Sequence, residues 1–512
     1  MVSPQAGAVY AGASRFSLQR QQQAYLDQDQ NTDRANDRFL AAEVFGQSPM
    51  SPRLSGLGVE YCLGLLYSSE SGKREASIGF EVGQRNTELG SRGETPILFD
   101  IQPAIPVRID LLDEHGQPTM GHFVFRQRDE LGGRVFPLQP KRVAPDLFFQ
   151  PQVYRQHGET VMLPPGLFDV EYGRGPEYQV KRCELRVLEK EPAPTVVARL
   201  ERWIDPEKHG FFSGDHHIHA AGCSHYTVPT EGVTPEDMFR QVKGEGLHVG
   251  CVLTWGPCYD FQRRFFSERP HGLSEPRTIL KYDVEVSGFG SQALGHVCLL
   301  NLRDQTYPGS EGTATKGWPT WTTPVMRWAK QQGAVTGYAH SASGMHIDAE
   351  AAGKRLHAKL DADQDGGLSR DEVREALLPE RFERIDSDGD RTLTLAELVA
   401  SHDRVADQLP NYAIPELNGV GAMEIFVSTA EGVCDFISAM DTGRVQEWNT
   451  WYHLLNCGFP VKVSGETDFP CMSSRRVGQG RVYVQLGPDT KLDFDKWCGG
   501  LASGKSYVSD GY

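Results

Sequence analysis

Alternating apolar and polar residues predict strands in the first 200 residues of the chain. Over about residues 59–83, VEYCLGLLYSS and ASIGFEVG alternate around the turn SESGKRE, which predicts a hairpin. PVRIDLL continues the pattern by placing Val107, Ile109 and Leu111 on one face, and HFVFR alternates again after the turn EHGQP. Residues 46–200 are therefore expected to form a β-rich sandwich region.

From about residue 205 the pattern changes to helical segments that are followed by short apolar strands. TPEDMFRQVKGEG begins with a capping Thr234 and Pro235 at the first helical position, and LHVGCVLTW follows it as a buried strand. VMRWAKQQG with AVTGYAHS, and TWYHLLNCG with FPVKVSGETD, repeat this order of helix, Gly stop and strand. The pattern is typical of an α/β barrel, in which chemistry lies where the strands end.

Composition excludes two classes of partner. No apolar run approaches the roughly 20 residues of a membrane-spanning helix, so no membrane span is expected. The formal net charge is -16 and no Lys/Arg-rich run interrupts it, so nucleic acid is not an expected partner. A small-molecule substrate and calcium are the expected partners, and the sequence does not indicate the oligomeric state.

The first 45 residues contain too little apolar surface to offset their ordering entropy, and we expect them to form a polar tail. They lack the basic start and continuous apolar core of a secretory signal. A cytoplasmic location is therefore the default expectation, and export would require a true start upstream of this sequence.

Two oxygen-rich loops of twelve residues predict calcium sites. The first, DADQDGGLSRDE, has Gly366 at its sixth position and oxygen donors at the spacing of an EF-hand loop. A solvated acidic loop is the alternative, which so complete a spacing disfavours. The predicted ligands are Asp361, Asp363, Asp365, the Gly367 carbonyl, Ser369 and Glu372.

The second loop, DSDGDRTLTLAE, repeats the pattern, and residues 351–405 are therefore expected to form an EF-hand pair. Arg391 stands where the sharp turn favours Gly, so this loop is expected to bind calcium more weakly. Leu368 and Leu393, at the eighth positions, are expected to join the loops through a short β bridge. The predicted ligands are Asp386, Asp388, Asp390, the Thr392 carbonyl, Thr394 and Glu397.

Histidines and carboxylates at the expected strand ends predict a second kind of metal site. In GDHHIH, His217 and His219 face the same side of a strand and can meet one ion, whereas His216 points away. Coincidence or core hydrogen bonding would explain an isolated pair equally well. Taken together with the remaining candidates, the pair forms a set suited to two borderline metals. These candidates are Glu285, His296, His340 and Asp468.

The succession GDHHIH, VEVSGFGSQALGH, GAVTGYAHS, AMEIFVS, WYHLLNCGFPVKVSGETD and GRVYV resembles the CehA/McbA-like branch of the PHP (polymerase and histidinol phosphatase) superfamily, over about residues 205–512. The resemblance implies a distorted (β/α)7 barrel formed by residues 205–350 and 410–512, with the EF-hand pair as an insertion. Relatives continue beyond the terminal LASGKSYVSDGY. The strand rhythm over about residues 103–190 is similar to that of the transthyretin-like modules that accompany many hydrolases.

The same resemblance implies how the ligands are shared. One metal is held by His217, His219, Glu285 and Asp468, and Glu285 bridges to a second metal held by His296 and His340. We therefore expect two divalent transition metals, Zn, Mn or Fe, in addition to Ca.

Broader members of the superfamily use a third metal, for which the ligand set is incomplete here. His225 fits one ligand position by spacing, but Trp255 and Pro470 stand at the other two and cannot ligate. His225 is therefore expected to contact substrate or donate a proton. Asp215 is expected to orient a ligating His, although an Asp at this place could equally cap a turn.

The expected activity is metal-dependent hydrolysis of an ester, amide or phosphoester bond in a small molecule, through a water activated by two metals. Arg475 and Arg476 could bind an anionic group, although adjacent arginines are more often solvated surface. The competing hypothesis is a non-catalytic, calcium-dependent binding or surface protein with a degenerate barrel. The incomplete third site favours this alternative, and the complete ligand sets of the other two sites oppose it.

Overall fold

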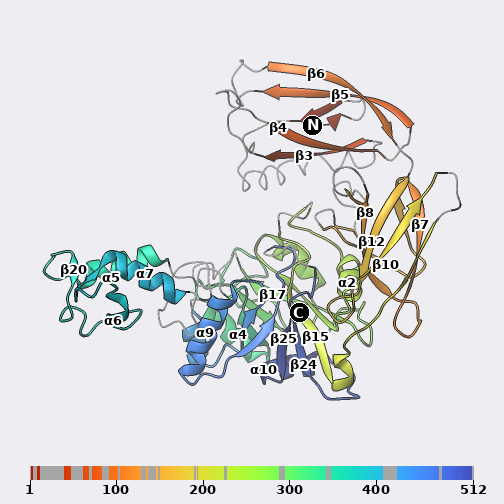
Figure 1. Cartoon of the computed structure of the whole chain (residues 1–512). Helices are drawn as coiled ribbons and strands as arrows, with labels where there is room; N and C mark the ends of the chain where they lie inside the picture. The colour runs from red at the N-terminus through yellow and green to blue at the C-terminus, as the bar shows by residue number, and fades with distance from the viewer. Residues whose placement is uncertain are drawn as a thin grey trace. The chain divides into compact units, whose positions relative to one another are not determined.

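The computed structural model describes most of the chain from residue 104 onwards (Figure 1). The ranges described there are 104–128, 134–136, 146–147, 150–189, 192, 194–223, 226, 228–287, 295–341, 348–406, 422, 424–471 and 476–509. Before residue 104 it describes strands alone. These are β1 (Val2–Ser3), β2 (Ala8–Ala11), β3 (Leu40–Gln47), β4 (Tyr61–Ser68), β5 (Gly72–Val82) and β6 (Ser91–Ile101).

Two compact units make up the described chain, Met1–Asp205 with Ala220–Gly246, and Pro206–His219 with Leu247–Tyr512. In the first unit the segment predicted as a polar tail contains β1, β2 and most of β3. The hairpin predicted over residues 59–83 is wrong, because β4 pairs with β3 and β5 pairs with β2 and β6. Alternation marks a segment as a strand, but its partner depends on register and burial against the rest of the chain.

The rest of the β-rich region forms two sheets with one core. A five-stranded sheet has the order β10-β8-β12-β13 with β9 on β8, and a three-stranded sheet has the order β11-β7-β14. The strands are β7 (Ile105–Leu112), β8 (Met120–Gln127), β9 (Arg134–Phe136), β10 (Val153–Gln156), β11 (Thr160–Leu163), β12 (Gly166–Gly173), β13 (Lys181–Val187) and β14 (Thr195–Arg199).

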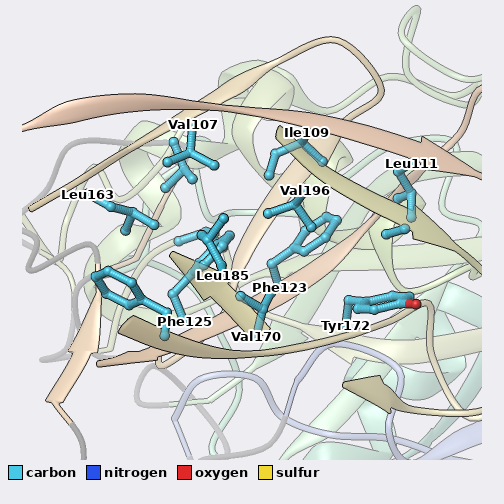
Figure 2. Packing of buried hydrophobic residues seen from close by; sticks show 14 of the residues in the cluster. Val107, Ile109, Leu111, Phe123, Phe125, Leu163, Val170, Tyr172, Leu185 and Val196 are labelled. Carbon is cyan, nitrogen blue, oxygen red and sulfur yellow. The ribbon is translucent and has the colours of Figure 1, made fainter. Parts of the chain in front are cut away.

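The predicted apolar face of β7 lies in that core. Val107, Ile109 and Leu111 are fully buried, which confirms the expected alternation. Figure 2 shows them in one cluster with Phe123 and Phe125 of β8, which belongs to the other sheet. The two sheets therefore bury their facing side chains against each other.

Helix α2 (Pro235–Gly244) confirms the predicted start signal. The Thr234 hydroxyl accepts a hydrogen bond from the Asp237 backbone N–H, and Pro235 occupies the first turn. Such a cap satisfies one of the backbone N–H groups that a helix leaves unpaired at its start.

The second unit is built on a nine-stranded mixed sheet with the order β23-β22-β19-β18-β17-β16-β15-β24-β25. Its strands are β15 (Phe211–Ile218), β16 (Val249–Thr254), β17 (Ile279–Val286), β18 (Val297–Leu300), β19 (Val335–Tyr338), β22 (Phe436–Ala439), β23 (Lys462–Gly465), β24 (Arg481–Gln485) and β25 (Ser506–Ser509). A parallel bridge joins Ile218 to Phe469, so the chain just beyond β23 lies beside the end of β15 and the sheet is nearly closed.

Helices alternate with these strands, so the described residues form a mixed α/β fold around a barrel-like sheet. The helices are α3 (Tyr259–Gln262), α4 (Thr322–Gln331), α8 (Ile425–Ala430), α9 (Arg444–Asn456) and α10 (Phe494–Ala502). Among the described residues, no helix has both the length and the apolar character that crossing a membrane requires.

The predicted calcium-binding segment folds around a small core of its own. It contains α5 (Ala349–Leu360), β20 (Gly367–Leu368), α6 (Phe382–Ile385), β21 (Leu393–Thr394) and α7 (Leu395–Ala406). Strand β20 pairs with β21 so that Leu368 lies opposite Leu393, which confirms the predicted bridge. Both leucines are fully buried.

Candidate metal centre

The predicted transition-metal ligands come together at one edge of the nine-stranded sheet. Strands β15, β17, β19 and β23 run in the same direction, and their carboxyl-terminal ends meet at this edge. His296 precedes β18, which runs the opposite way, so its amino-terminal end lies at the same edge. The other five side chains lie near the carboxyl-terminal ends of parallel strands because strand direction places them there.

Four donor atoms form the first group. His217 Nε2 lies 2.9 Å from His219 Nε2, 3.3 Å from Glu285 Oε2 and 3.4 Å from Asp468 Oδ1. His219 Nε2 lies 3.1 Å from the same Glu285 oxygen and 3.0 Å from the same Asp468 oxygen. A tetrahedral ion with ligand bonds of about 2.0–2.1 Å would separate its ligand atoms by roughly 3.3 Å. The spacing therefore fits one small divalent cation.

The second oxygen of Glu285 faces a second group. Glu285 Oε1 lies 3.3 Å from His296 Nδ1 and 3.5 Å from His340 Nε2, and these two nitrogens are 2.8 Å apart. Glu285 Oε1 is buried without a hydrogen-bond partner among the described residues, as is Asp468 Oδ1. Leaving such oxygens unpaired is costly, and bound cations would satisfy both.

Contacts at the Nδ1 atoms orient the two imidazoles of the first group. His217 Nδ1 lies 2.7 Å from Glu466 Oε2, and His219 Nδ1 lies 2.9 Å from the Leu253 carbonyl oxygen. Because a carbonyl only accepts, the His219 Nδ1 carries its hydrogen, and the Glu466 carboxylate favours the same tautomer of His217. Both Nε2 lone pairs then face each other, an arrangement that a cation between them stabilises.

Glu466 is a residue that the sequence analysis missed. Its second oxygen accepts the backbone N–H of His340 at 2.6 Å, and His216 Nε2 lies 3.3 Å from the oxygen that contacts His217. Its signal in the sequence was its position at the same strand end as Asp468. Glu466 therefore contacts residues of both metal groups from a fully buried position.

The carboxylates make this place attractive to positive charge. Burial by itself lowers the pKa of His219, but the nearby carboxylates of Asp468 and Glu285 raise it to about 9. Metal ions and protons compete for such nitrogens, so a divalent cation would displace the protons on binding.

Asp215 contacts the backbone of a ligating His rather than its ring. Its carboxylate accepts the backbone N–H groups of His217 at 3.1 Å, Thr467 at 3.2 Å and Gly478 at 2.9 Å. Burial raises the pKa of Asp215 to about 6. Asp215 thus fixes the loop that carries Asp468 against the end of β15. The contact with a ligating imidazole that we expected of Asp215 is made by Glu466 instead.

A further carboxylate that the sequence analysis did not single out lies beyond β22. Burial, with the charges of Glu466 and Asp468, raises the pKa of Asp441 to about 9. The neighbouring Glu447 accepts the backbone N–H groups of Met440 and Thr442 and so fixes the turn around Asp441. His225 and Arg475 lie outside the described residues.

The two loops predicted to bind calcium bring only part of each predicted ligand set together. One carboxylate oxygen from each of Asp361, Asp363 and Glu372 lies within 4.8 Å of the other two, and Asp386, Asp388 and Glu397 repeat the arrangement. Asp365 Oδ1 instead accepts the Gly367 N–H, and Asp390 Oδ1 accepts the Thr392 N–H. The hydroxyls of Ser369 and Thr394 donate to Glu372 and Glu397, respectively.

The sixth position of both loops has a left-handed backbone. Gly366 has φ 88° and Arg391 has φ 74°. A left-handed residue other than Gly costs roughly 1–2 kcal/mol. The second loop therefore carries backbone strain at Arg391 that the first loop avoids with Gly366.

Replacing Glu466 by Gln is expected to lower the affinity for the metal bound through His217 by about 10- to 100-fold, the usual effect of losing a carboxylate behind a ligating His. The fold should persist because Gln keeps the size of the side chain and one oxygen that can accept the His340 backbone N–H. Competition with a chromogenic chelator measures the affinity. Glu207→Gln, which removes a carboxylate that contacts His248, is the matched control. Equal affinities of Glu466→Gln and the control would contradict the assignment.

Comparison with known proteins adds little to this geometry. No protein-family model matches the chain, and no curated protein matches it. Among solved structures, the Bacillus anthracis TIE protein is similar over 36% of this chain and 36% of its own, at 13% sequence identity and a TM-score of 0.12. A likeness at this level carries no argument about fold or function, so the interpretation of the site depends on its own residues.

Proposed function

We propose that the chain is a metal-dependent hydrolase that cleaves an ester, amide or phosphoester bond in a small molecule. The observation that carries this proposal is the buried Glu285 carboxylate, whose two oxygens face two separate pairs of histidines. A carboxylate shared in this way would hold two borderline metals close together, and dinuclear hydrolysis requires two such neighbouring ions.

Each residue has a separate part in this proposal. His217, His219 and Asp468 would hold one ion, His296 and His340 the other, and Glu285 would bind both. When bound, two cations supply an activated water at neutral pH and polarise the scissile carbonyl or phosphoryl oxygen. Glu466 and the Leu253 carbonyl keep the imidazole nitrogens turned towards the ions. Asp215 holds the loop of Asp468 in place.

The finer architecture is also a proposal. The nearly closed sheet with ligands at one edge supports a PHP-type barrel, and the two sheets over residues 105–199 support a sandwich. The separate core of the 351–405 segment and its β20–β21 bridge support an inserted EF-hand pair.

Elemental analysis together with activity on a panel of aryl esters, amides and phosphodiesters tests the proposed function. We expect two transition-metal ions per chain, and turnover that a chelator abolishes and added metal restores. Substitution of the six proposed ligands should remove both the bound ions and the turnover. A protein that carries both ions and is silent on every substrate would favour the non-catalytic binding role.

Calcium is expected to bind the 351–405 segment and to stabilise it by neutralising its clustered carboxylates. Glu372→Gln should weaken total calcium binding more than Glu397→Gln, because the left-handed Arg391 already compromises the second loop. The two variants are controls for each other, since each loses one carboxylate at the same loop position. Calorimetric titration measures the difference. Equal losses of calcium binding in the two variants, or no calcium binding by the wild type, would count against the predicted calcium sites.

A further inference from the structure

The six predicted transition-metal ligands differ in exposure, and the difference shows from which side solvent reaches the centre. The side chains of His217, Glu285, His219 and Asp468 are 0, 2, 2 and 4% exposed. His340 is 7% exposed, whereas His296 is 23% exposed. A substrate would therefore approach from the side of His296.

Trp255 lies beside this centre. It directly follows β16, and its ring centroid is 5.4 Å from that of His219 with an interplanar angle of 36°. The indole is partly exposed, although the imidazole that it contacts is buried. The next residue, Gly256, donates its N–H to the Ser287 carbonyl, and the Ser287 hydroxyl lies 2.9 Å from His296 Nδ1. The Trp255 turn is thus connected to both metal groups.

The backbone of Trp255 is held before any ligand binds. Its carbonyl oxygen accepts the Cys258 N–H at 3.0 Å and the Cys258 thiol at 3.1 Å. Cys258 and Tyr259 are buried, and the Tyr259 hydroxyl donates to the Gln305 carbonyl at 2.7 Å. A turn anchored in this way presents an aromatic face at little entropic cost on binding.

An aromatic side chain at this place does not ligate a metal, but it offers a flat apolar surface next to His219, one of the proposed ligands. Offset or edge contacts between aromatic groups contribute about 0.5–1.5 kcal/mol beyond the burial of their area. A substrate with a planar ring gains this contribution. A substrate with the same scissile bond but a short alkyl group does not. Trp255 would therefore favour substrates that carry a planar ring over substrates that carry a short alkyl group.

On the basis of the proposed hydrolase function, we propose that Trp255 forms one wall of the substrate pocket and that the substrate carries a planar, unsaturated group next to the scissile bond. The ring of such a substrate would stack on the indole while its scissile carbonyl or phosphoryl oxygen reaches the metals. Trp255 is then a residue that determines specificity and takes no part in proton transfer.

Binding of two hydroxamates to the metal-loaded full chain tests this inference without turnover. Benzohydroxamate and acetohydroxamate chelate metal through the same headgroup and differ in the ring alone. We expect the wild type to bind benzohydroxamate at least about tenfold more tightly, which corresponds to burial of a ring plus its stacking on Trp255. Calorimetric titration gives both affinities.

Three variants make the test specific. Trp255→Ala should reduce the preference to about twofold while keeping two ions per chain, and Trp255→Phe should keep part of the preference. Trp448→Ala, which removes a tryptophan that is 40% exposed on α9, should retain the full preference.

The outcomes separate this inference from the proposed function. Equal affinities for the two hydroxamates in the wild type, or a full preference in Trp255→Ala, would overturn the role of Trp255 and leave the hydrolase proposal standing. A chain that holds both ions and binds neither hydroxamate would overturn both.

Discussion

Glu285→Gln is expected to remove both ions of the metal centre and to lower hydrolytic turnover by more than about a hundredfold. Its two oxygens lie within 3.5 Å of nitrogens of His217, His219, His296 and His340, so a neutral amide at this place weakens both groups at once. Gln has one oxygen and no net charge, and it cannot bridge two cations. Elemental analysis of the purified variant measures the number of ions retained.

His225→Ala is the companion variant, since the incomplete third site predicts that it leaves both ions in place and affects turnover at most. The metal contents of Glu285→Gln and His225→Ala therefore distinguish a two-metal centre from a three-metal centre. Retention of one full equivalent of metal by Glu285→Gln would show that Glu285 does not bridge. A third tightly bound transition metal that disappears in His225→Ala would show that the incomplete site is functional.

Asp283→Ala is expected to lower the free energy of unfolding by about 3–5 kcal/mol, because it leaves the buried Lys281 without the carboxylate that balances its charge. Asp283 and Lys281 are both fully buried in β17, and Lys281 Nζ donates to Asp283 Oδ1 at 2.7 Å. The carboxylate also accepts the backbone N–H groups of Asn301 at 2.8 Å and Leu302 at 3.1 Å. Asp283 thus fixes the turn after β18, at the edge of the sheet opposite to the metal ligands.

The double variant Lys281→Met with Asp283→Leu should recover part of this loss, because replacing both charges removes the unpaired ammonium group. Lys330→Ala is the control, since it breaks an ion pair with Asp435 whose groups are 30% and 16% exposed. Denaturant unfolding at fixed metal and calcium concentrations gives the comparison. A loss below about 1 kcal/mol in Asp283→Ala would show that water or another group compensates Lys281.

Local patterns in the sequence determined features that need only neighbouring residues. The alternation of Val107, Ile109 and Leu111 predicted the buried face of β7, and Thr234 with Pro235 predicted the start of α2. The twelve-residue spacing predicted two loops bridged through Leu368 and Leu393. These features depend on backbone periodicity and on hydrogen bonds within a few residues, which the order of residues specifies directly.

The spacing of residue types at strand ends also predicted the six side chains that come together at the candidate metal centre, although not their geometry. Their convergence depends on five strands whose ends meet at one edge of the sheet, from β15 near residue 217 to the loop after β23 at residue 468. That the two oxygens of Glu285 face different pairs of histidines follows from side-chain direction, which spacing along the chain does not encode.

Tertiary structure alone decided the pairing of strands and the surroundings of the metal centre. Strands β4 and β5 are neighbours in sequence, yet each pairs with another strand, because register and burial select the partner. Glu466 shares a strand end with Asp468 in the sequence, but its contact with His217, which is 249 residues away in the chain, appears only in the folded structure. The role proposed for Trp255 likewise depends on its contact with the ring of His219, which only the folded structure shows. Contacts of this kind are selected by the packing of the whole sheet, whereas propensity and periodicity are properties of short segments.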